Sequence, residues 1–217
     1  MRKEKTPMGI LDDISAMLQK GKRKDVKALC EQALEEGIPA AQILNDGLLA
    51  GMDIVGAQFK ENKIFVPQVM VAARAMNTGA EVLKPHLSDG DTSSKGKIAL
   101  GTVKGDLHDI GKNLVKMMFE GKGFEVIDLG VDVAPETFVQ TAIDNDCQIV
   151  ACSALLTTTM PMLGEVVKTA EEMGVRDKIK IMIGGAPVTQ DFCDSIGADA
   201  YTEDATSAAD KALEYVS

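Results

Sequence analysis

The segment GDLHDIG, residues 105–111, holds the side chains of this chain that are best suited to bind a metal ion. His108 is one of only two histidines in 217 residues, and Asp106 and Asp109 stand on either side of it. A carboxylate that binds one ring nitrogen orients an imidazole whose other nitrogen ligates a metal. Taken alone, the pattern leaves simpler roles open, because His108 could be a core residue and either aspartate could cap a following helix.

Hydroxyl and glycine residues follow two further apolar runs. The run CQIVACSA leads into four hydroxyl side chains, those of Ser153, Thr157, Thr158 and Thr159. The run KIKIMIGG ends in Gly184 and Gly185, which could by themselves form an ordinary tight turn. The chain has no G-x-G-x-x-G, no P-loop and no G-x-S-x-G. We therefore expect neither a phosphate cradle nor a hydrolase elbow.

The second half of the chain alternates short apolar runs with helical segments. We expect strands at 97–103, 124–130, 147–154 and 178–185, with a weaker one at 198–202. We expect helices near 111–121, 135–145, 161–174, 188–195 and 204–216. Such alternation predicts a parallel sheet covered on both faces, in which ligands bind outside the carboxyl ends of the strands. His108 would lie at that edge.

Residues 9–86 have the apolar spacing of helices throughout. We expect one helix ending at Gly21, a second ending at Gly37, a longer third one beginning near Pro39 and a fourth with Pro67 in its first turn. The polar segment LSDGDTSSKG separates them from the sheet. The predicted domains are a four-helix bundle in 1–88, a linker in 89–96 and a sheet domain in 97–217.

Composition excludes several classes of function. The formal net charge of −10 argues against nucleic acid as a partner, because Lys and Arg must neutralise its phosphates. The four cysteines show no C-x-x-C pair and no zinc-ligand spacing, and we expect them to be reduced. No signal peptide and no membrane-spanning stretch is evident, so we expect a cytoplasmic protein that does not associate with membranes.

Three motifs at set separations make the chain resemble the cobalamin-binding proteins of methyltransferase systems. They are D-x-H-x-x-G at 106–111, S-x-L at 153–155 after 41 residues, and G-G at 184–185 after 28 more. The helical half, and FKENKIFVPQVMVAARAM above all, resembles the cap over the corrin ring in methionine synthase and in free-standing corrinoid proteins. The resemblance implies an α/β fold: a four-helix cap and a flavodoxin-like, Rossmann-type, doubly wound sheet of five parallel strands.

The resemblance assigns roles toward a cobalamin (methylcobalamin or a related corrinoid) whose dimethylbenzimidazole is displaced from cobalt. His108 would be the lower axial ligand of cobalt, and Asp106 would hold the other nitrogen of its imidazole ring. Thr159, where the family often has serine, would complete a His–Asp–hydroxyl relay. Ser153 and Thr157 would contact the buried nucleotide. The other matched positions are Gly105, Leu107, Asp109, Gly111, Leu155, Gly184, Gly185 and Ala205, with Phe59 and Val66 above the ring. His86 is expected at the surface.

The resemblance also implies a methyl carrier. Cobalt(I) would take a methyl group from a substrate-specific partner methyltransferase, and methylcobalt(III) would deliver it to a second methyltransferase acting on a thiol or a reduced pterin. A reductive activase would reduce cobalt(II) back to cobalt(I). Whether the chain catalyses a reaction alone stays open. The methyl donor also stays open among methylamines, quaternary amines, methanol, methoxylated aromatics and methyl thiols, because the partner holds the substrate.

Three other functions share some of these features. The small subunit of a cobalamin-dependent isomerase carries the same three motifs but needs no helical cap. A cobalamin-based sensor or regulator can carry a helical domain but needs an output, and we expect no DNA-binding domain in this acidic chain. A flavodoxin-like domain could match the motifs by accident. The capped methyl carrier accounts for both halves of the chain.

Overall fold

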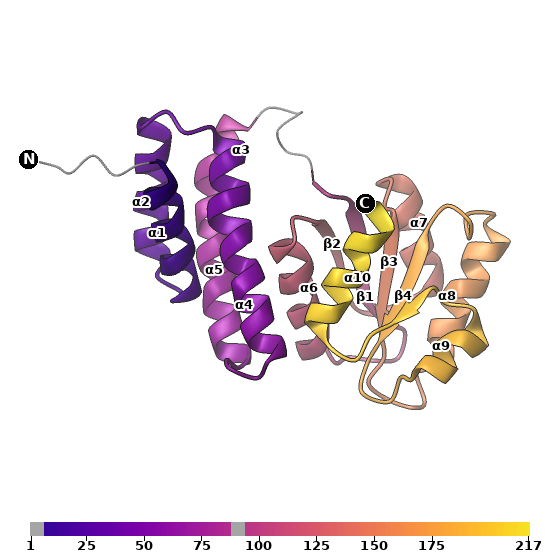
Figure 1. Cartoon of the computed structure of the whole chain (residues 1–217). Helices are drawn as coiled ribbons and strands as arrows, with labels where there is room; N and C mark the ends of the chain where they lie inside the picture. The colour runs from indigo at the N-terminus through magenta and orange to yellow at the C-terminus, as the bar shows by residue number, and fades with distance from the viewer. Residues whose placement is uncertain (1–6, 88–93) are drawn as a thin grey trace, which may run out of the picture. The chain divides into compact units, whose positions relative to one another are not determined.

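The computed structural model of the chain describes residues 7–87 and 94–217. The chain divides into two compact units, residues 1–93 and residues 94–217 (Figure 1). The last helical segment of the first unit ends at His86, and the first strand of the second unit begins at Lys97. Of the linker expected in 89–96, residues 89–93 lie outside the described part of the chain.

The first unit consists of helices that pack side by side. Its segments are α1 (Pro7–Gln19), α2 (Arg23–Glu35), α3 (Ala40–Gln42), the π-helix η1 (Ile43–Leu49), α4 (Ala50–Lys60), α5 (Val66–Leu83) and the 3₁₀ turn η2 (Lys84–His86). Helix α1 packs on α2 and α4, and α5 packs on the same two helices. Gly21 and Gly37 follow α1 and α2 in the left-handed region, with φ of 66° and 81°, which suits a residue without Cβ.

The third helical segment differs from the uninterrupted helix that we expected. Seven residues between α3 and α4 form the π-helix η1. Gly47 lies in this stretch and Gly51 in the first turn of α4. An added Cβ would come within 3.2 Å of Ile14 at Gly47 and within 3.2 Å of Leu18 at Gly51, and both partners belong to α1. The helices therefore approach closely at these glycines. Apolar spacing predicts the buried face of such a helix but not a local change in the number of residues per turn.

The second unit contains a sheet of five parallel strands. They are β1 (Lys97–Val103), β2 (Glu125–Val133), β3 (Ile149–Ser153), β4 (Lys180–Gly184) and β5 (Ala200–Tyr201). Their spatial order is β2-β1-β3-β4-β5, and every neighbouring pair is parallel. This order is that of flavodoxin-like folds, in which the chain reverses direction across the sheet between β1 and β3. The expected fold class is confirmed.

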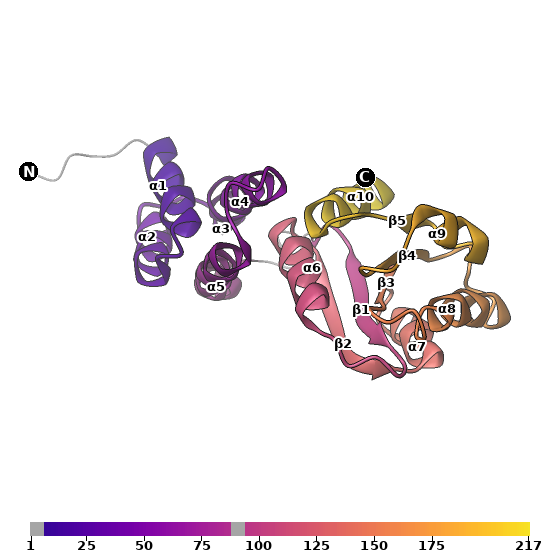
Figure 2. The same cartoon turned by 90° about the horizontal axis from the view of Figure 1, so that it is seen from below.

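Helices cover both faces of the sheet, as Figure 2 shows. The helices are α6 (Ile110–Gly121), α7 (Pro135–Asp144), α8 (Pro161–Glu172), α9 (Gln190–Ile196) and α10 (Ala205–Val216). Helices α6 and α10 pack together on one face, whereas α7, α8 and α9 lie on the other. Strand β2 is longer than expected, because two irregularities in its pairing with β1 let it continue to Val133.

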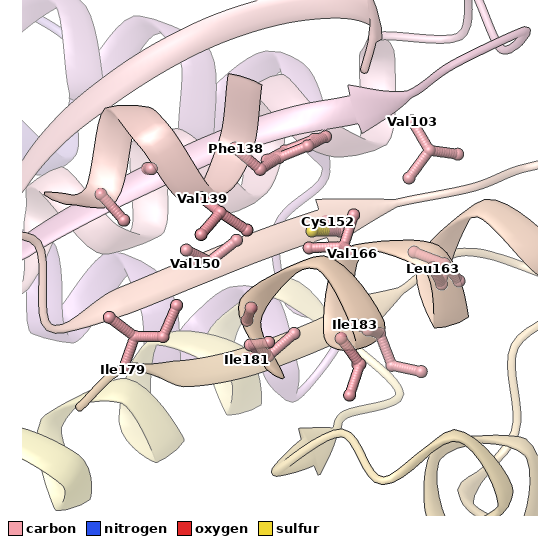
Figure 3. Packing of buried hydrophobic residues seen from close by; sticks show 14 of the residues in the cluster. Val103, Phe138, Val139, Val150, Cys152, Leu163, Val166, Ile179, Ile181 and Ile183 are labelled. Atoms are coloured by element: carbon pink, nitrogen blue, oxygen red, sulfur yellow. The ribbon is translucent and has the colours of Figure 1, made fainter. Parts of the chain in front are cut away.

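The core beneath α7 and α8 is tightly filled with aliphatic side chains. Val150, Cys152 and Ile181 of the central strands pack against Phe138 and Leu163 of the helices (Figure 3). Strands buried on both faces need apolar residues at consecutive positions, which is why runs such as IVACS do not alternate with polar residues. This core holds the strand ends in place.

All four cysteines are free and buried. Burial raises the pKa of the Cys30 thiol to about 12 and that of Cys147 to about 11. These thiols therefore stay protonated and unreactive near neutral pH. Among the described residues, no helix combines the length and the apolar character needed to cross a membrane.

The packing of β1 on α7 gives a test of the core. A Cβ at Gly101 would lie 2.8 Å from Cε1 of the buried Phe138. We expect Gly101→Ala to lower the free energy of unfolding by about 1–3 kcal/mol, because the ring has no room to move. Urea unfolding of the protein without cofactor measures this change. Gly184→Ala is the matched control, because a Cβ there meets no atom within 4 Å; equal losses in both variants would contradict the packing argument.

Candidate functional site

His108 lies in the loop between β1 and α6, at the carboxyl edge of the sheet. Strand β1 ends at Val103, and the chain turns through Gly105, whose φ is 83°. The backbone N–H of Asp106 donates to the carbonyl oxygen of Val103 over 3.1 Å and closes the turn. Asp109 occupies the N-cap position of α6 but forms no side-chain capping bond. The capping role considered for this residue is therefore absent, and the His108 side chain stays 52% exposed.

The Asp106 carboxylate is fully buried beside this half-exposed imidazole. Its Oδ1 lies 2.7 Å from Nδ1 of His108 and accepts the His108 backbone N–H over 3.1 Å. Its Oδ2 accepts the Leu155 N–H at 2.7 Å, the Leu156 N–H at 3.2 Å and the Thr159 hydroxyl at 2.8 Å. One carboxylate thus joins the loop after β1 to the loop after β3.

These contacts decide the ionisation state of the carboxylate. Burial alone would raise the pKa of Asp106, but hydrogen bonds from His108, Leu155 and Thr159 hold that pKa well below its ordinary value. An ionised carboxylate only accepts hydrogen bonds. Nδ1 of His108 must therefore carry the proton in this contact, and Nε2 of the neutral ring keeps a free lone pair.

Two buried threonine hydroxyls form hydrogen bonds with the loop that carries His108. Thr159 is 6% exposed, and its contact with Asp106 gives the His–Asp–hydroxyl arrangement that the resemblance implied. Thr102, which sequence reasoning missed, is fully buried, and its hydroxyl donates to the carbonyl oxygen of His108 over 2.8 Å. The same hydroxyl lies 2.8 Å from the hydroxyl of Ser153. The one available signal was a polar residue inside the apolar run KIALGTV.

The two glycines at the end of β4 occupy different environments. A Cβ added to Gly184 would meet no atom within 4 Å, so there is open space beside this residue. A Cβ added to Gly185, whose φ is 135°, would collide with the carbonyl oxygen of Ala154. The resemblance assigns both glycines to the cofactor site. Only Gly184 borders open space, whereas Gly185 permits close contact between the ends of β3 and β4.

Large apolar side chains surround His108 and are exposed. They are Leu107 at 72%, Ile110 at 78%, Leu155 at 43% and Leu156 at 41%. The first two belong to the loop after β1 and the start of α6, and the other two to the loop after β3. Ile110 and Leu156 were not singled out in the sequence. Clustered apolar exposure at one sheet edge indicates a site that an apolar ligand or partner covers.

The remaining candidate positions are spread over both units. Thr157 is exposed in the loop after β3, Gly111 is exposed in the first turn of α6, and Ala205 is buried as the first residue of α10. Phe59, in the last turn of α4, and Val66, the first residue of α5, are half-buried in the helical unit.

No described group of three or more His, Cys, Asp and Glu side chains could hold a metal ion.

Family models match both units of the chain. One, described as a B12 binding domain, matches residues 96–211, and another with the same description matches residues 10–84. Trimethylamine corrinoid protein 1 of Methanosarcina acetivorans is 46% identical over 84% of this chain and 86% of its own length. Dimethylamine corrinoid protein 1 of the same organism is 44% identical over 94% of this chain and 96% of its own length.

A solved structure extends this likeness to three dimensions. A chain in the crystal structure of the methanol:cobalamin methyltransferase complex MtaBC from Methanosarcina barkeri superposes with a TM-score of 0.88. The two sequences are 32% identical, and the match covers 96% of this chain and 80% of that chain. The likeness therefore spans the helical unit and the sheet unit.

The site fits a cobalamin. A corrin ring would supply most of the ligands of its own cobalt, so the single free nitrogen Nε2 of His108 suits such a cofactor. The exposed Leu107, Ile110 and Leu155 offer the apolar surface that a large flat ring covers, and the open space at Gly184 can admit a further part of the molecule. The matched models and the relatives agree with this chemistry: the chain belongs to the family of B12-binding corrinoid proteins, and its cofactor is a cobalamin.

Proposed function

We propose that this chain is the methyl-carrying corrinoid subunit of a methyltransferase system. The observation that carries the proposal is the pair of Asp106 and His108, which holds one ring nitrogen at 2.7 Å and leaves the other free at the sheet edge. The named relatives are trimethylamine and dimethylamine corrinoid proteins, and the similar chain of known structure comes from a methanol:cobalamin methyltransferase complex. Both support a carrier role.

His108 would hold the cobalt of the cofactor through Nε2. Cobalamin supplies the cobalt atom that takes up and gives away the methyl group. Asp106 keeps the proton on Nδ1 and strengthens Nε2 as an electron donor. If no cobalt occupied Nε2, this atom could hold a proton, and the Asp106 carboxylate would stabilise the imidazolium. The Thr159 hydroxyl donates to Oδ2 of Asp106 over 2.8 Å. This hydrogen bond draws negative charge toward Oδ2 and so lowers the charge on Oδ1, the oxygen that contacts the imidazole ring.

The displaced nucleotide of the cofactor is assigned to the edge between β3 and β4. Ser153 and Thr157 supply hydroxyls for it, and Gly184 borders the open space that it needs. Gly185 lets the ends of the two strands approach. The other residues that we propose to contact the cofactor are Gly105, Leu107, Asp109, Gly111, Leu155 and Ala205.

The helical unit is the proposed cap. Phe59 and Val66 are half-buried apolar residues at the end of α4 and the start of α5, and we assign them to the upper face of the ring. A partner could not reach a cofactor covered in this way, so the cap would have to move aside during each transfer. Such a cap would have a gating role typical of lids.

The proposal requires partners. A substrate-specific methyltransferase would load the methyl group, a second one acting on a thiol or a reduced pterin would remove it, and a reductive activase would rescue oxidised cofactor. The chain then needs no substrate pocket, because each partner positions its own substrate against the bound cofactor.

Histidine ligation can be tested by electron paramagnetic resonance of the protein loaded with cob(II)alamin. Protein whose histidines carry ¹⁵N should show nitrogen coupling of the ¹⁵N type, which distinguishes an imidazole from the cofactor's own ¹⁴N base. We expect His108→Ala to lose this coupling. His86→Ala is the matched control, because His86 is the other histidine and is exposed. Retention of the ¹⁵N coupling in His108→Ala would remove His108 from the ligand role.

The cap can be tested by photolysis of the protein loaded with methylcobalamin. Residues 94–217 form a compact unit of their own, and a chain that starts at Ser94 should lose its methyl group to light faster than the full chain does. The full-length double variant Phe59→Ala/Val66→Ala should also photolyse faster, because its side chains no longer confine the methyl radical. Ile54→Ala, which alters an exposed residue of α4, is the control. Equal photolysis rates in all four proteins would contradict a shielding role.

The carrier role itself can be tested by the fate of the bound methyl group. The methylated protein alone should react negligibly with free thiols or reduced pterin, because this chain positions neither. Addition of a methyltransferase selected from a panel for its ability to load the protein should discharge the methyl group rapidly. Absorbance of the bound cofactor measures the loss, with an inactive methyltransferase as control. Rapid turnover by the isolated chain would show that it is an enzyme in its own right.

A further inference from the structure

The carboxyl end of the edge strand β2 departs from regular parallel pairing. The register of β2 against β1 shifts after Leu100 and again after Gly101. Within this irregular stretch Gly130 has a φ of 81° and Asp132 a φ of 55°. A residue other than glycine is uncommon in the left-handed region, although aspartate tolerates it better than most. This conformation at Asp132 therefore calls for a compensating interaction.

Asp132 has two such interactions, and both are with the loop that carries His108. Its Oδ1 accepts the backbone N–H of Gly105 over 2.7 Å. Its own backbone N–H donates to the carbonyl oxygen of Asp106 over 3.0 Å. One residue of β2 thus holds both ends of the Gly105–Asp106 dipeptide. The left-handed conformation lets the strand present its N–H and its carboxylate to the same two residues.

The stretch of β2 that leads to Asp132 is itself held firmly. Asp128 Oδ1 accepts the backbone N–H of Gly130 over 3.0 Å and the ammonium of Lys112 over 2.6 Å. Lys116 lies 3.3 Å from the other oxygen of Asp128. The Lys112 side chain is only 2% exposed and belongs to α6, which begins just after His108. The loop is therefore attached to β2 at its start and near its end.

We propose that Asp132 is a positioning residue for His108. It holds the Gly105–Asp106 backbone from the β2 side, while Leu155 and Thr159 hold the Asp106 carboxylate from the β3 side. The inference deepens the proposed function, because it rests on ligation of the cofactor by His108. Because Asp106 is held on both sides, its Oδ1 has one orientation. The imidazole of His108, which contacts Oδ1, therefore has one orientation as well.

A double-mutant cycle between Asp132 and His108 tests the inference. Asp132→Gly keeps the left-handed conformation free of strain and removes only the side-chain acceptor. Because Asp132→Gly removes a single hydrogen bond, we expect it to raise the dissociation constant for cob(II)alamin about fivefold in the His108-containing chain. In the His108→Ala background the same substitution should change it less than twofold, because no ligand remains to be positioned. Asp132→Asn keeps an acceptor and should stay within twofold in both backgrounds.

Asp146→Gly is the matched control. Asp146 is another exposed aspartate in the left-handed region, with a φ of 53°, and it lies between α7 and β3 at the opposite end of the sheet. This substitution should leave the dissociation constant unchanged. Urea unfolding of each variant without cofactor checks that the fold is intact.

The outcomes separate the inference from the proposed function. If the ¹⁵N coupling of His108 is absent from the parent protein, the proposed ligation fails. If that coupling is present but Asp132→Gly weakens binding equally with and without His108, Asp132 is merely structural and the inference is overturned. A larger effect in the His108-containing chain, restored by Asp132→Asn, supports it.

Discussion

The buried carboxylate of Asp106 is the interaction on which the rest of the site depends. It has no solvent exposure. Hydrogen bonds from His108, from Thr159 and from the backbone N–H groups of Leu155 and Leu156 stabilise its negative charge. A buried charge is tolerated only when it is fully hydrogen-bonded. The loop after β1 and the loop after β3 must therefore meet at this carboxylate, and the orientation of His108 follows from that requirement.

The strand order explains why these two loops are neighbours. In the order β2-β1-β3-β4-β5, the chain reverses direction across the sheet between β1 and β3, and the two adjacent loops leave a crevice at the carboxyl edge. His108 follows β1, and the exposed Leu155 and Leu156 follow β3. The ligand site is thus a product of topology, and the buried core beneath α7 and α8 keeps both strands in register.

Much of the fold could be predicted from residue patterns. Apolar runs such as KIALGTV predict strands buried on both faces, and helical spacing predicts the bundle, because both signals are local. The bulged extension of β2 to Val133 and the π-helix η1 could not be predicted, since both arise from packing against distant segments. The two-residue strand β5 (Ala200–Tyr201) lies within the weaker strand expected at 198–202, and its short length explains why the pattern there is weak.

The sequence by itself determined which chemistry to expect of this protein, because the residue types and separations of His108, Asp106 and the glycine pair resemble those of known cobalamin-binding proteins. Only the tertiary structure decided how the motif is held. The contacts of Thr102 with His108 and of Asp132 with Gly105 join residues that no short motif contains. Their roles depend on strand pairing and on a local left-handed backbone, and these are properties of the folded chain rather than of any one segment.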